Sequence, residues 1–395
     1  MTKEVKVLIK SIKVMLLPSN KQRTKLFQSA GVARWAYNWT LARQQDNYKN
    51  GGKFISNGEL RKELTQLKKT KEYEWLNDYS CNIPKQSIKD ACLAYQRFFK
   101  KQSKFPKFKS KRKTRPSFYI DTCKIEFSEN KVKLEKIANS KKKNKQKLNW
   151  IKLAENNRIP INCKYYNPRV TSDGVNFFIS VGIDFEPSQD QPTNDGIGID
   201  LGIKDLVICS DKNTYKNINK TKQIKKLKKK KRRLQRRVSK KYLKNKKGGS
   251  YCKTSNIIKS EKQLLKLNHR LTNIRHNYLN QVTSEIINRK QKYIVLEDLN
   301  VRGMMKNKHL ARAVQEQCFY EFYRQIQYKC SWNNIQFITA DRYFPSSKLC
   351  SCCGNIKKDL KLSDRVYRCS ECGNEIDRDY QASLNLAEYG RKLIA

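Results

Sequence analysis

Four cysteines near the C-terminus have the spacing of a metal-binding cluster. They form two Cys-x-x-Cys-Gly sequences, at 350–354 and 369–373, joined by a short and mostly polar segment. Four thiolates at this spacing can enclose Zn²⁺ in a tetrahedral shell, and each glycine permits the tight turn that directs two sulfurs at one ion. Cys352 lies inside the first sequence and is expected to be a spare thiol. The predicted ligands of one structural Zn²⁺ are Cys350, Cys353, Cys369 and Cys372.

Three acidic residues stand at the ends of predicted elements far apart in the chain. Asp200 lies near the end of a strand, Glu297 ends a second strand, and Asp379 opens the last helix. Carboxylates that converge from separate elements can hold two Mg²⁺ ions, roughly 4 Å apart, around a phosphate group. One such Asp alone is more often a turn former or a helix cap, so the prediction depends on the three together. Asp377 is the alternative to Asp379.

The charge of the chain points to a polyanionic partner. Lys and Arg number 86 against 35 Asp and Glu, which gives a formal net charge of +51. Such self-repulsion does not stabilise a fold, and neutralising phosphates would relieve it. The cations are clustered, with 16 Lys or Arg and no acid between Thr221 and Lys247. A generic solubilising surface is the plainer alternative, but the clustering of the cations favours a nucleic acid as the partner. The segment with the zinc-binding cysteines could also contact that nucleic acid.

Other residue types narrow the class of protein. Only three histidines are present, too few for nucleases or transposases built on histidine ligands. Lysines interrupt the apolar residues of 5–17, and no run approaches the roughly 18 apolar residues that span a bilayer. We therefore expect an intracellular, cytoplasmic protein with no membrane partner and with reduced cysteines.

The first half of the chain combines one helical region with many short strands. Residues 4–17 alternate between apolar and polar, as in a strand, and 117–185 alternate again in short pieces that suggest a small barrel or sheet. Residues 100–116 mix lysines with Phe105 and Phe108, a composition suited to nucleic-acid contact. Residues 186–196 are the clearest linker. Helices are predicted at 21–50, 56–68 and 85–101.

The second half alternates strands and helices. Below the basic run of 221–247, apolar residues recur at helical spacing, so this segment is predicted to be a helix that packs against a second helix, 261–289, across Gly248-Gly249. A further helix is predicted at 311–333. Strands are predicted at 197–201, 206–209, 214–216, 293–296 and 335–340.

Several of these motifs together resemble one known family. The motifs are Gly198-Ile199-Asp200-Leu201-Gly202, Leu296-Glu297-Asp298-Leu299, Phe344-Pro345-Ser346-Ser347-Lys348 and Asp377-Arg378-Asp379. They are similar to those of TnpB, also called OrfB, a family encoded by small insertion sequences and related to type V CRISPR effectors. The resemblance covers nearly the whole chain. Two positions depart from the family pattern, since Gln381 replaces the usual Asn and Ser383 the usual second Ala, and weaker support of the metal site is expected from them.

The resemblance implies a fold, a reaction and partners. It implies a multidomain α/β protein that cleaves DNA as an RNA-guided endonuclease, with Asp200, Glu297 and Asp379 as Mg²⁺-binding catalytic acids. The partners would be a guide RNA from the transposon end and double-stranded target DNA. It leaves open whether the protein is a monomer or a dimer. The implied domains are a wedge β-barrel (1–17 and 103–192), a helical recognition domain (18–102), a ribonuclease H-like RuvC nuclease domain (193–345 and 376–395, with the basic hairpin 221–289) and a zinc ribbon (346–375).

Two alternatives and one set of contacts remain open. A nuclease-inactive regulator would bind RNA and DNA without cutting, and a transposase would catalyse strand transfer directly. Lys85 and Gln86 are candidates for reading a short motif beside the target, and the basic helix is expected to contact phosphates. Its candidate residues are Lys228, Arg232 and Arg236.

Overall fold

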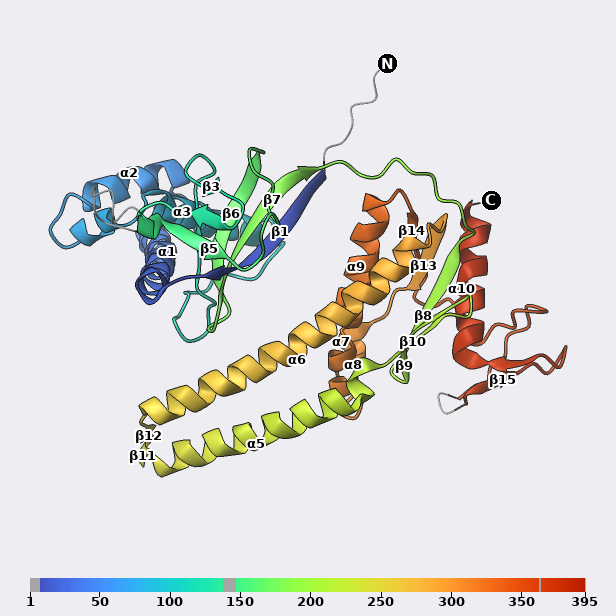
Figure 1. Cartoon of the computed structure of the whole chain (residues 1–395). Coiled ribbons are helices and arrows are strands. Elements are labelled where there is room, and N and C mark those ends of the chain that lie inside the picture. The colour runs from blue at the N-terminus through green and yellow to red at the C-terminus, as the bar shows by residue number, and fades with distance from the viewer. Residues whose placement is uncertain (1–7, 138–146, 362–363, 395) are drawn as a thin grey trace, which may run out of the picture. The chain divides into compact units, whose positions relative to one another are not determined.

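The computed structural model describes residues 8–137, 147–361 and 364–394, which form two compact units (Figure 1). The first unit comprises Met1–Phe185 and the second Glu186–Ala395. The first residues of the strand predicted at 4–17 lie outside the described part of the chain. No helix within the described part is long and apolar enough to cross a membrane.

The first unit contains an antiparallel sheet of seven strands, in the order β2-β6-β7-β1-β5-β4-β3. The N-terminal strand β1 pairs with β7 along most of its length and with β5 at its end. Alternate residues of β1, namely Ile12, Val14 and Leu16, are buried in the core, which is the period-2 pattern predicted from the sequence. The strands are β1 (Leu8–Leu17), β2 (Ser117–Tyr119), β3 (Glu126–Phe127), β4 (Lys131–Lys133), β5 (Trp150–Leu153), β6 (Tyr165–Ser172) and β7 (Phe177–Phe185), and η2 (Lys147–Asn149) is a 3₁₀ turn.

The helices of the first unit begin at identifiable caps. Ser19 and Ser56 each form a capping box, in which the serine side chain and a Gln or Glu three residues later satisfy each other's backbone amides. The helix predicted at 85–101 begins earlier, because Pro84 is accepted in a first helical turn, where no amide is needed. The helices are α1 (Asn20–Lys49), α2 (Asn57–Leu67), η1 (Glu74–Asp78) and α3 (Asn82–Phe99).

The second unit is built on a sheet of five strands, in the order β10-β9-β8-β13-β14. Strands β8, β13 and β14 are parallel, and β9 and β10 continue the sheet antiparallel at the β8 side. The predicted strands are confirmed at these positions. The strands are β8 (Ile197–Leu201), β9 (Asp205–Cys209), β10 (Thr214–Lys216), β13 (Tyr293–Glu297) and β14 (Gln336–Ala340).

The two faces of this sheet pack against different helices. Ile199 and Leu296 belong to one core with side chains of helices α6 (Ser255–Asn288) and α9 (Phe319–Trp332). Tyr293 and Val295 belong to another, with Leu386 of the C-terminal helix α10 (Arg378–Ile394). Successive strand residues point to opposite faces, so the strands present their intervening residues to α10, which lies along the sheet in Figure 1.

Helix α10 approaches strand β8 unusually closely at Gly198. A Cβ atom at this position would lie 2.1 Å from the Ser383 carbonyl oxygen and 2.3 Å from the Ala387 amide nitrogen. Both are backbone atoms that cannot turn aside, so only glycine fits here. This contact brings the first turn of α10 to the strand that carries Asp200.

A long helical hairpin extends from the sheet, and its two helices lie side by side (Figure 1). Helix α5 (Lys222–Lys244) follows a 3₁₀ turn, η3 (Ile218–Lys220), and a small ribbon of β11 (Lys246–Lys247) and β12 (Ser250–Tyr251) turns the chain at Gly248-Gly249. Helix α6 begins six residues before the predicted 261, because Thr254 caps it. The predicted apolar seam is confirmed and consists of Ile224, Leu227, Leu234, Leu267 and Leu271.

The prediction of a single helix at 311–333 is wrong. The structure has two helices, α8 (Ala311–Gln317) and α9, interrupted at Cys318, whose φ is 57°. Hydrogen bonds to distant residues hold the end of α8 in this conformation: the Asn219 side chain donates to the Glu316 carbonyl, and the Gln317 side-chain amide donates to the Gly202 carbonyl. A short helix, α7 (Val301–Met304), precedes them, and β15 (Val366–Arg368) and β16 (Glu375–Asp377) pair between the cysteines and α10.

Replacing Gly198 with alanine tests the close approach of α10 to β8. The added methyl group must push the two backbones apart, and we expect the free energy of unfolding to fall by about 1–3 kcal/mol or more. Gly249→Ala is the matched control, because no atom lies within 4 Å of a Cβ there. Urea denaturation of the two variants is the measurement, and equal stability would contradict the packing described.

Candidate metal centres and basic surfaces

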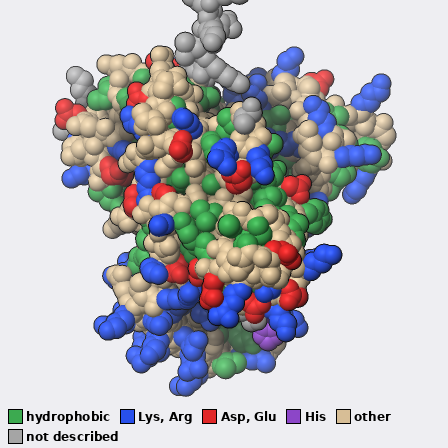
Figure 2. Space-filling view, turned by 90° about the vertical axis from the view of Figure 1, so that its right-hand side faces the viewer, with side chains coloured by type: hydrophobic (Ala, Val, Ile, Leu, Met, Phe, Trp, Pro, Cys, Tyr) green, Lys and Arg blue, Asp and Glu red, His purple; other side chains and the backbone are tan. Residues whose placement is uncertain are grey.

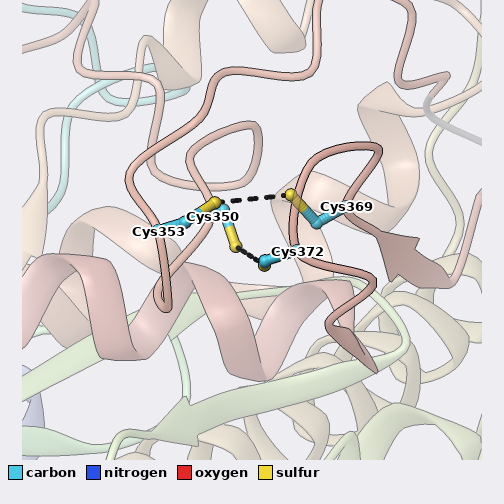
Figure 3. Close-up of side chains that lie close together, drawn as sticks. All are labelled: Cys350, Cys353, Cys369 and Cys372. Carbon is cyan, nitrogen blue, oxygen red and sulfur yellow. Dashed lines mark hydrogen bonds between the residues drawn. The ribbon is translucent and has the colours of Figure 1, made fainter.

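The four predicted zinc ligands lie together in the structure (Figure 3). Their sulfur atoms all lie within 4.8 Å of one another. The Sγ atoms of Cys350 and Cys372 are 3.6 Å apart, as are those of Cys353 and Cys369. Cys352 is exposed and does not belong to the group. The sequence prediction of which cysteines converge is therefore confirmed.

Local backbone geometry explains this convergence. In each Cys-x-x-Cys-Gly sequence the glycine has a positive φ, 77° at Gly354 and 69° at Gly373, which a residue with a Cβ adopts with strain. The chain then folds back, so that the amides of Cys350 and Cys369 donate to the carbonyls of Asn355 and Asn374. The two turns meet over the fully buried ring of Tyr367.

The cysteine cluster fits a tetrahedral metal ion. With Zn–S bonds of roughly 2.3 Å, two sulfurs of a tetrahedral site lie about 3.8 Å apart, close to the 3.6 Å separations seen here. A hydrogen bond from the Cys372 backbone amide lowers the pKa of Cys369 to about 6, whereas the pKa values of Cys353 and Cys372 are raised in the same cluster. Four cysteines with all ligand positions filled are typical of a structural site, not a catalytic one.

The three predicted catalytic acids lie on the α10 side of the five-stranded sheet. Asp200 follows Gly198 by two residues on β8, and Glu297 follows Val295 by two on β13, so both point to the face that α10 covers. The register of the parallel pair places Leu296 opposite Ile199, so the next residues, Glu297 and Asp200, are neighbours. Asp379 comes from the first turn of α10.

The charges of Glu297 and Asp379 act on Asp200. Burial raises the pKa of Asp200 well above its usual value, and the charges of Glu297 and Asp379 raise it further, while Arg378 acts in the opposite direction. Burial also raises the pKa of Glu297, partly offset by a hydrogen bond from Ser346. Two or three crowded carboxylates disfavour the ionised form unless a cation joins them.

Arginines hold Asp379, and Asp377 has a different role. Arg378 lies 2.9 Å from one carboxylate oxygen of Asp379 and Arg365 lies 3.6 Å from the other. Asp377 accepts the backbone amides of Asp379 and Tyr380, each at 3.0 Å, and so caps α10. Of the two alternatives left by the sequence, Asp379 therefore lies with Asp200 and Glu297.

The acidic cluster suits a divalent cation by its donor chemistry. Its ligand atoms are carboxylate oxygens, which Mg²⁺ prefers, and a cation would relieve the repulsion that raises the pKa of Asp200. The cluster is more open than the cysteine site, since within the described residues the four cysteines alone bring their ligand atoms within 4.8 Å of one another.

The two family departures lie in the core beside this cluster. Gln381 and Ser383 are fully buried on α10. The Gln381 amide nitrogen donates to the Leu349 carbonyl at 2.8 Å, whereas its buried side-chain oxygen has no hydrogen-bond partner. Ser383 donates to the Tyr380 carbonyl within its own helix. Gln381 thus makes one of the contacts expected of an amide at this position and leaves its oxygen unsatisfied, which carries a cost.

Of the predicted phosphate contacts on α5, one is already engaged inside the protein. Lys228 forms a half-buried ion pair with Glu316 of α8, which Arg275 also approaches at 3.5 Å. Arg232 and Arg236 are exposed, and Arg232 lines a groove of about 660 Å³ that contains Glu316. Lys228 therefore ties the hairpin to α8, and its ammonium group is less available to phosphate.

Sequence reasoning missed the more cationic side of the hairpin. A second groove, of about 830 Å³, lies between α5 and α6, and no acidic residue lines it. The i, i+3 and i, i+4 spacing of cations occurs on both faces of α5, so this pattern alone could not single out the groove. In Figure 2, Lys and Arg side chains crowd the lower edge of the face, at the height where Figure 1 draws α5. We call the second groove, between α5 and α6, the cationic groove. Its charged residues are Lys226, Lys229, Lys230, Arg233, Arg237, Lys266 and Arg270.

Lys85 and Gln86 lie in the first unit, near the start of α3. Lys85 is exposed, but the Gln86 amide donates to Asp90, which in turn forms a paired ion bridge with Arg169. Gln86 is therefore partly committed within its own unit.

Three family models match separate parts of the chain. Residues 8–53 match a helix-turn-helix domain of the OrfB family, residues 178–308 match the OrfB family described as "Probable transposase", and residues 319–386 match the "Cas12f1-like, TNB domain". The last of these spans the four cysteines and Asp379.

Similar proteins cover nearly the whole chain. A "Putative RNA-guided DNA endonuclease" of Streptomyces pristinaespiralis is 28% identical over 96% of this chain and 89% of its own length. "Putative RNA-guided DNA endonuclease InsQ" of Escherichia coli K12 is 27% identical over 98% of this chain and 94% of its own length. Among solved structures, Cas12f1 in its complex with sgRNA and target DNA has a TM-score of 0.59 at 11% identity, covering 96% of this chain and 99% of that one.

The fold is thus that of a Cas12f-type effector, with mixed α and β structure and a C-terminal cysteine cluster. The chain is similar to the TnpB (OrfB) family, whose models match residues 8–53 and 178–308, and to proteins named as putative RNA-guided DNA endonucleases over nearly its whole length.

Removing one cysteine of the cluster tests the structural metal site. We expect Cys369→Ser to reduce bound zinc from one equivalent per chain to nearly none, because three thiolates leave the shell open and weaken binding strongly. Cys352→Ser is the matched control and should keep its zinc, since Cys352 lies outside the group. Elemental analysis of the purified proteins is the measurement. A full equivalent of zinc in Cys369→Ser would show that the ligand assignment is wrong.

Proposed function

We propose that the protein is an RNA-guided DNA endonuclease that cleaves target DNA by divalent-ion-dependent phosphodiester hydrolysis. The observation that carries the proposal is the meeting of Asp200, Glu297 and Asp379, from two strands and a helix, on one face of the sheet. Relatives named for this activity align with nearly the whole chain. The cationic groove supplies a surface for a nucleic-acid backbone.

The finer domain assignment is part of the same proposal. The five-stranded sheet with α10 would be the ribonuclease H-like RuvC domain, and residues 346–375 the zinc ribbon. In the first unit, the seven-stranded sheet would correspond to the wedge and the helices α1 to α3 to the recognition domain. The alternating strand pattern, the acids at strand ends and the four-cysteine cluster support this division.

In the proposed reaction the acidic residues hold the ions and orient them. Bound Mg²⁺ would supply an activated water and charge stabilisation for the leaving 3′ oxygen. Asp200 is the acid on which the charges of both others act. Glu297 accepts a hydrogen bond from the Ser346 hydroxyl, and Asp379 forms ion pairs with Arg378 and Arg365.

The proposed partners are a guide RNA, from the transposon end, and double-stranded target DNA. In effectors of this kind, base pairing reads the sequence and the protein reads the backbone geometry. The cationic groove suits that role, because its side chains are exposed and none of them has an ion-pair partner in the described part of the chain. Residues 100–116 of the first unit, with exposed Phe105 and Phe108 among lysines, could stack unpaired bases.

Removing an acidic residue tests the cleavage reaction. We expect Asp200→Ala and Glu297→Gln each to lower Mg²⁺-dependent cleavage of DNA matching the bound RNA by at least about 100-fold, since each removes a direct metal ligand. Gel analysis of a plasmid carrying the matching site is the measurement.

Asp298→Asn is the matched control for Glu297→Gln. Asp298 is the next residue, and its ion pair with Arg342 is half exposed, so its loss should change little. Unchanged cutting by Asp200→Ala would refute the proposal. Specific DNA binding without any cutting by the unaltered protein would favour a regulator, and strand-transfer products without RNA would favour a transposase.

Neutralising the cationic groove tests its contact with phosphates. Replacing Lys229, Lys230, Arg233 and Arg237 with glutamine should reduce the slope of log K against log salt for RNA binding by about 3, because each lost phosphate contact removes roughly 0.7–0.9. Filter binding from low to high salt is the measurement. Lys228→Met is the comparison variant and should change the slope by less than about 1, since Lys228 is paired with Glu316. An unaltered slope in the fourfold variant would mean that the groove is only a solvated face.

A further inference from the structure

One short segment touches the acidic cluster, helix α10 and the cysteine cluster. It runs from Ser346 to Leu349, directly before the first zinc-ligand candidate, and we call it the strap. Hydrogen bonds from the amides of Lys348 and Leu349 to the Pro345 carbonyl give it the shape of a single helical turn. Ser346 is 5% exposed, so a polar residue here must find its partners inside the protein.

The Ser346 hydroxyl donates to a carboxylate oxygen of Glu297. This bond comes from a residue 49 positions away in the sequence. It also stabilises the charged form of Glu297, whose pKa burial raises. Among the described residues, no other side chain forms a hydrogen bond with this carboxylate, so Ser346 is its one side-chain partner there.

Helix α10 holds the strap through two buried amide side chains. Asn385 donates to the carbonyls of Ser346 and Leu349, at 2.6 and 2.7 Å. Gln381 donates to the same Leu349 carbonyl at 2.8 Å. Both side chains lie on the helix that carries Asp379, at most 3% exposed. The strap therefore cannot shift without breaking bonds to the element that positions the third acid.

The cysteine cluster holds the strap from the other side. The Tyr367 hydroxyl, from the core of the cluster, donates to the Lys348 carbonyl at 3.3 Å, and the Lys357 amide donates to it at 2.9 Å. Leu349 forms a bridge with Ile356 of the first cysteine turn, and the next residue is Cys350. Metal binding by the cysteines would fix these turns, and with them the strap.

We propose that Ser346 is a positioning residue for Glu297, and that the cysteine cluster controls the acidic cluster by holding the strap that carries Ser346. The inference rests on the proposed function, because it assumes that Glu297 binds a divalent cation. Ser346 itself is not required to touch the ion or the nucleic acid.

Mn²⁺ binding to the full-length protein tests the inference without any cleavage assay. Carboxylates suit Mn²⁺ and thiolates do not, so the ion reports on the acidic cluster, and the paramagnetic resonance signal of free Mn²⁺ measures its affinity. We expect Ser346→Ala to weaken binding by about 10-fold or more, the usual effect of losing a residue that orients a metal ligand. Ser346→Thr keeps the hydroxyl and should recover most of the affinity.

Ser347→Ala is the matched control. Ser347 is the adjacent residue, half-buried, and no hydrogen bond from its side chain links it to Glu297, so it should bind Mn²⁺ like the unaltered protein. Zinc content and thermal unfolding of each variant show whether the fold is kept. Equal Mn²⁺ affinity of Ser346→Ala and Ser347→Ala would overturn the positioning role.

The control by the cysteine cluster has its own comparison. Cys369→Ser should weaken Mn²⁺ binding as well, although Cys369 is no ligand of that ion, while Cys352→Ser should not. Unchanged Mn²⁺ affinity in zinc-free Cys369→Ser would overturn this part. Asp200→Ala distinguishes failure of the proposed metal site from failure of the strap's role. If Asp200→Ala also leaves Mn²⁺ binding unchanged, the acidic cluster is not the metal site. If Asp200→Ala alone loses Mn²⁺ binding, only the role of the strap is refuted.

Discussion

The backbone contact between α10 and β8 is the constraint on which the candidate site depends. At Gly198 the helix and the strand are so close that no side chain fits between them. This distance decides where the first turn of α10 lies, and so brings Asp379 to the residues at the ends of β8 and β13. An acidic site assembled in this way has a cost, since burial and repulsion raise the pKa of Asp200. The protein keeps three carboxylates where folding alone would disfavour them, which is common at functional sites.

Positive charge is distributed in a way that separates structural from available cations. Lys228, Arg275 and Arg312 all surround Glu316, the carboxylate that joins the hairpin to α8. The cations of the cationic groove face solvent on the other side of the same two helices. Some cations of the hairpin thus form ion pairs that attach it to α8, and the others remain exposed to solvent. The apolar seam beneath can tolerate this repulsion because leucines and isoleucines from both helices bury one another.

How much could be predicted from the sequence depended on the range of each interaction. The cysteine cluster was predictable because spacing and glycines act within a few residues. The strands and the hairpin seam followed from periodicity. Asp379 was the predicted acid and Asp377 its alternative, but the cap hydrogen bonds that give Asp377 a separate role could not be predicted from the sequence. The break at Cys318 and the pairing of Lys228 with Glu316 depend on residues roughly 90 or more positions away, for which local pattern gives no signal.

The order of elements near the C-terminus connects the cysteine cluster to two of the three acids. The last cysteine turn leads through β16 directly into α10, so only a few residues separate Cys372 from Asp379. At its other end the cluster begins right after the strap that contacts Glu297. A mobile cluster would therefore loosen two of the three acids at once, one through each end. A metal site with four thiolate ligands has no open position for substrate, and it is suited to keep this part of the chain rigid. The cysteine cluster lies in the sequence between Glu297 and Asp379. A role in holding these two acids rigidly in place explains this position better than a catalytic role of the cluster itself.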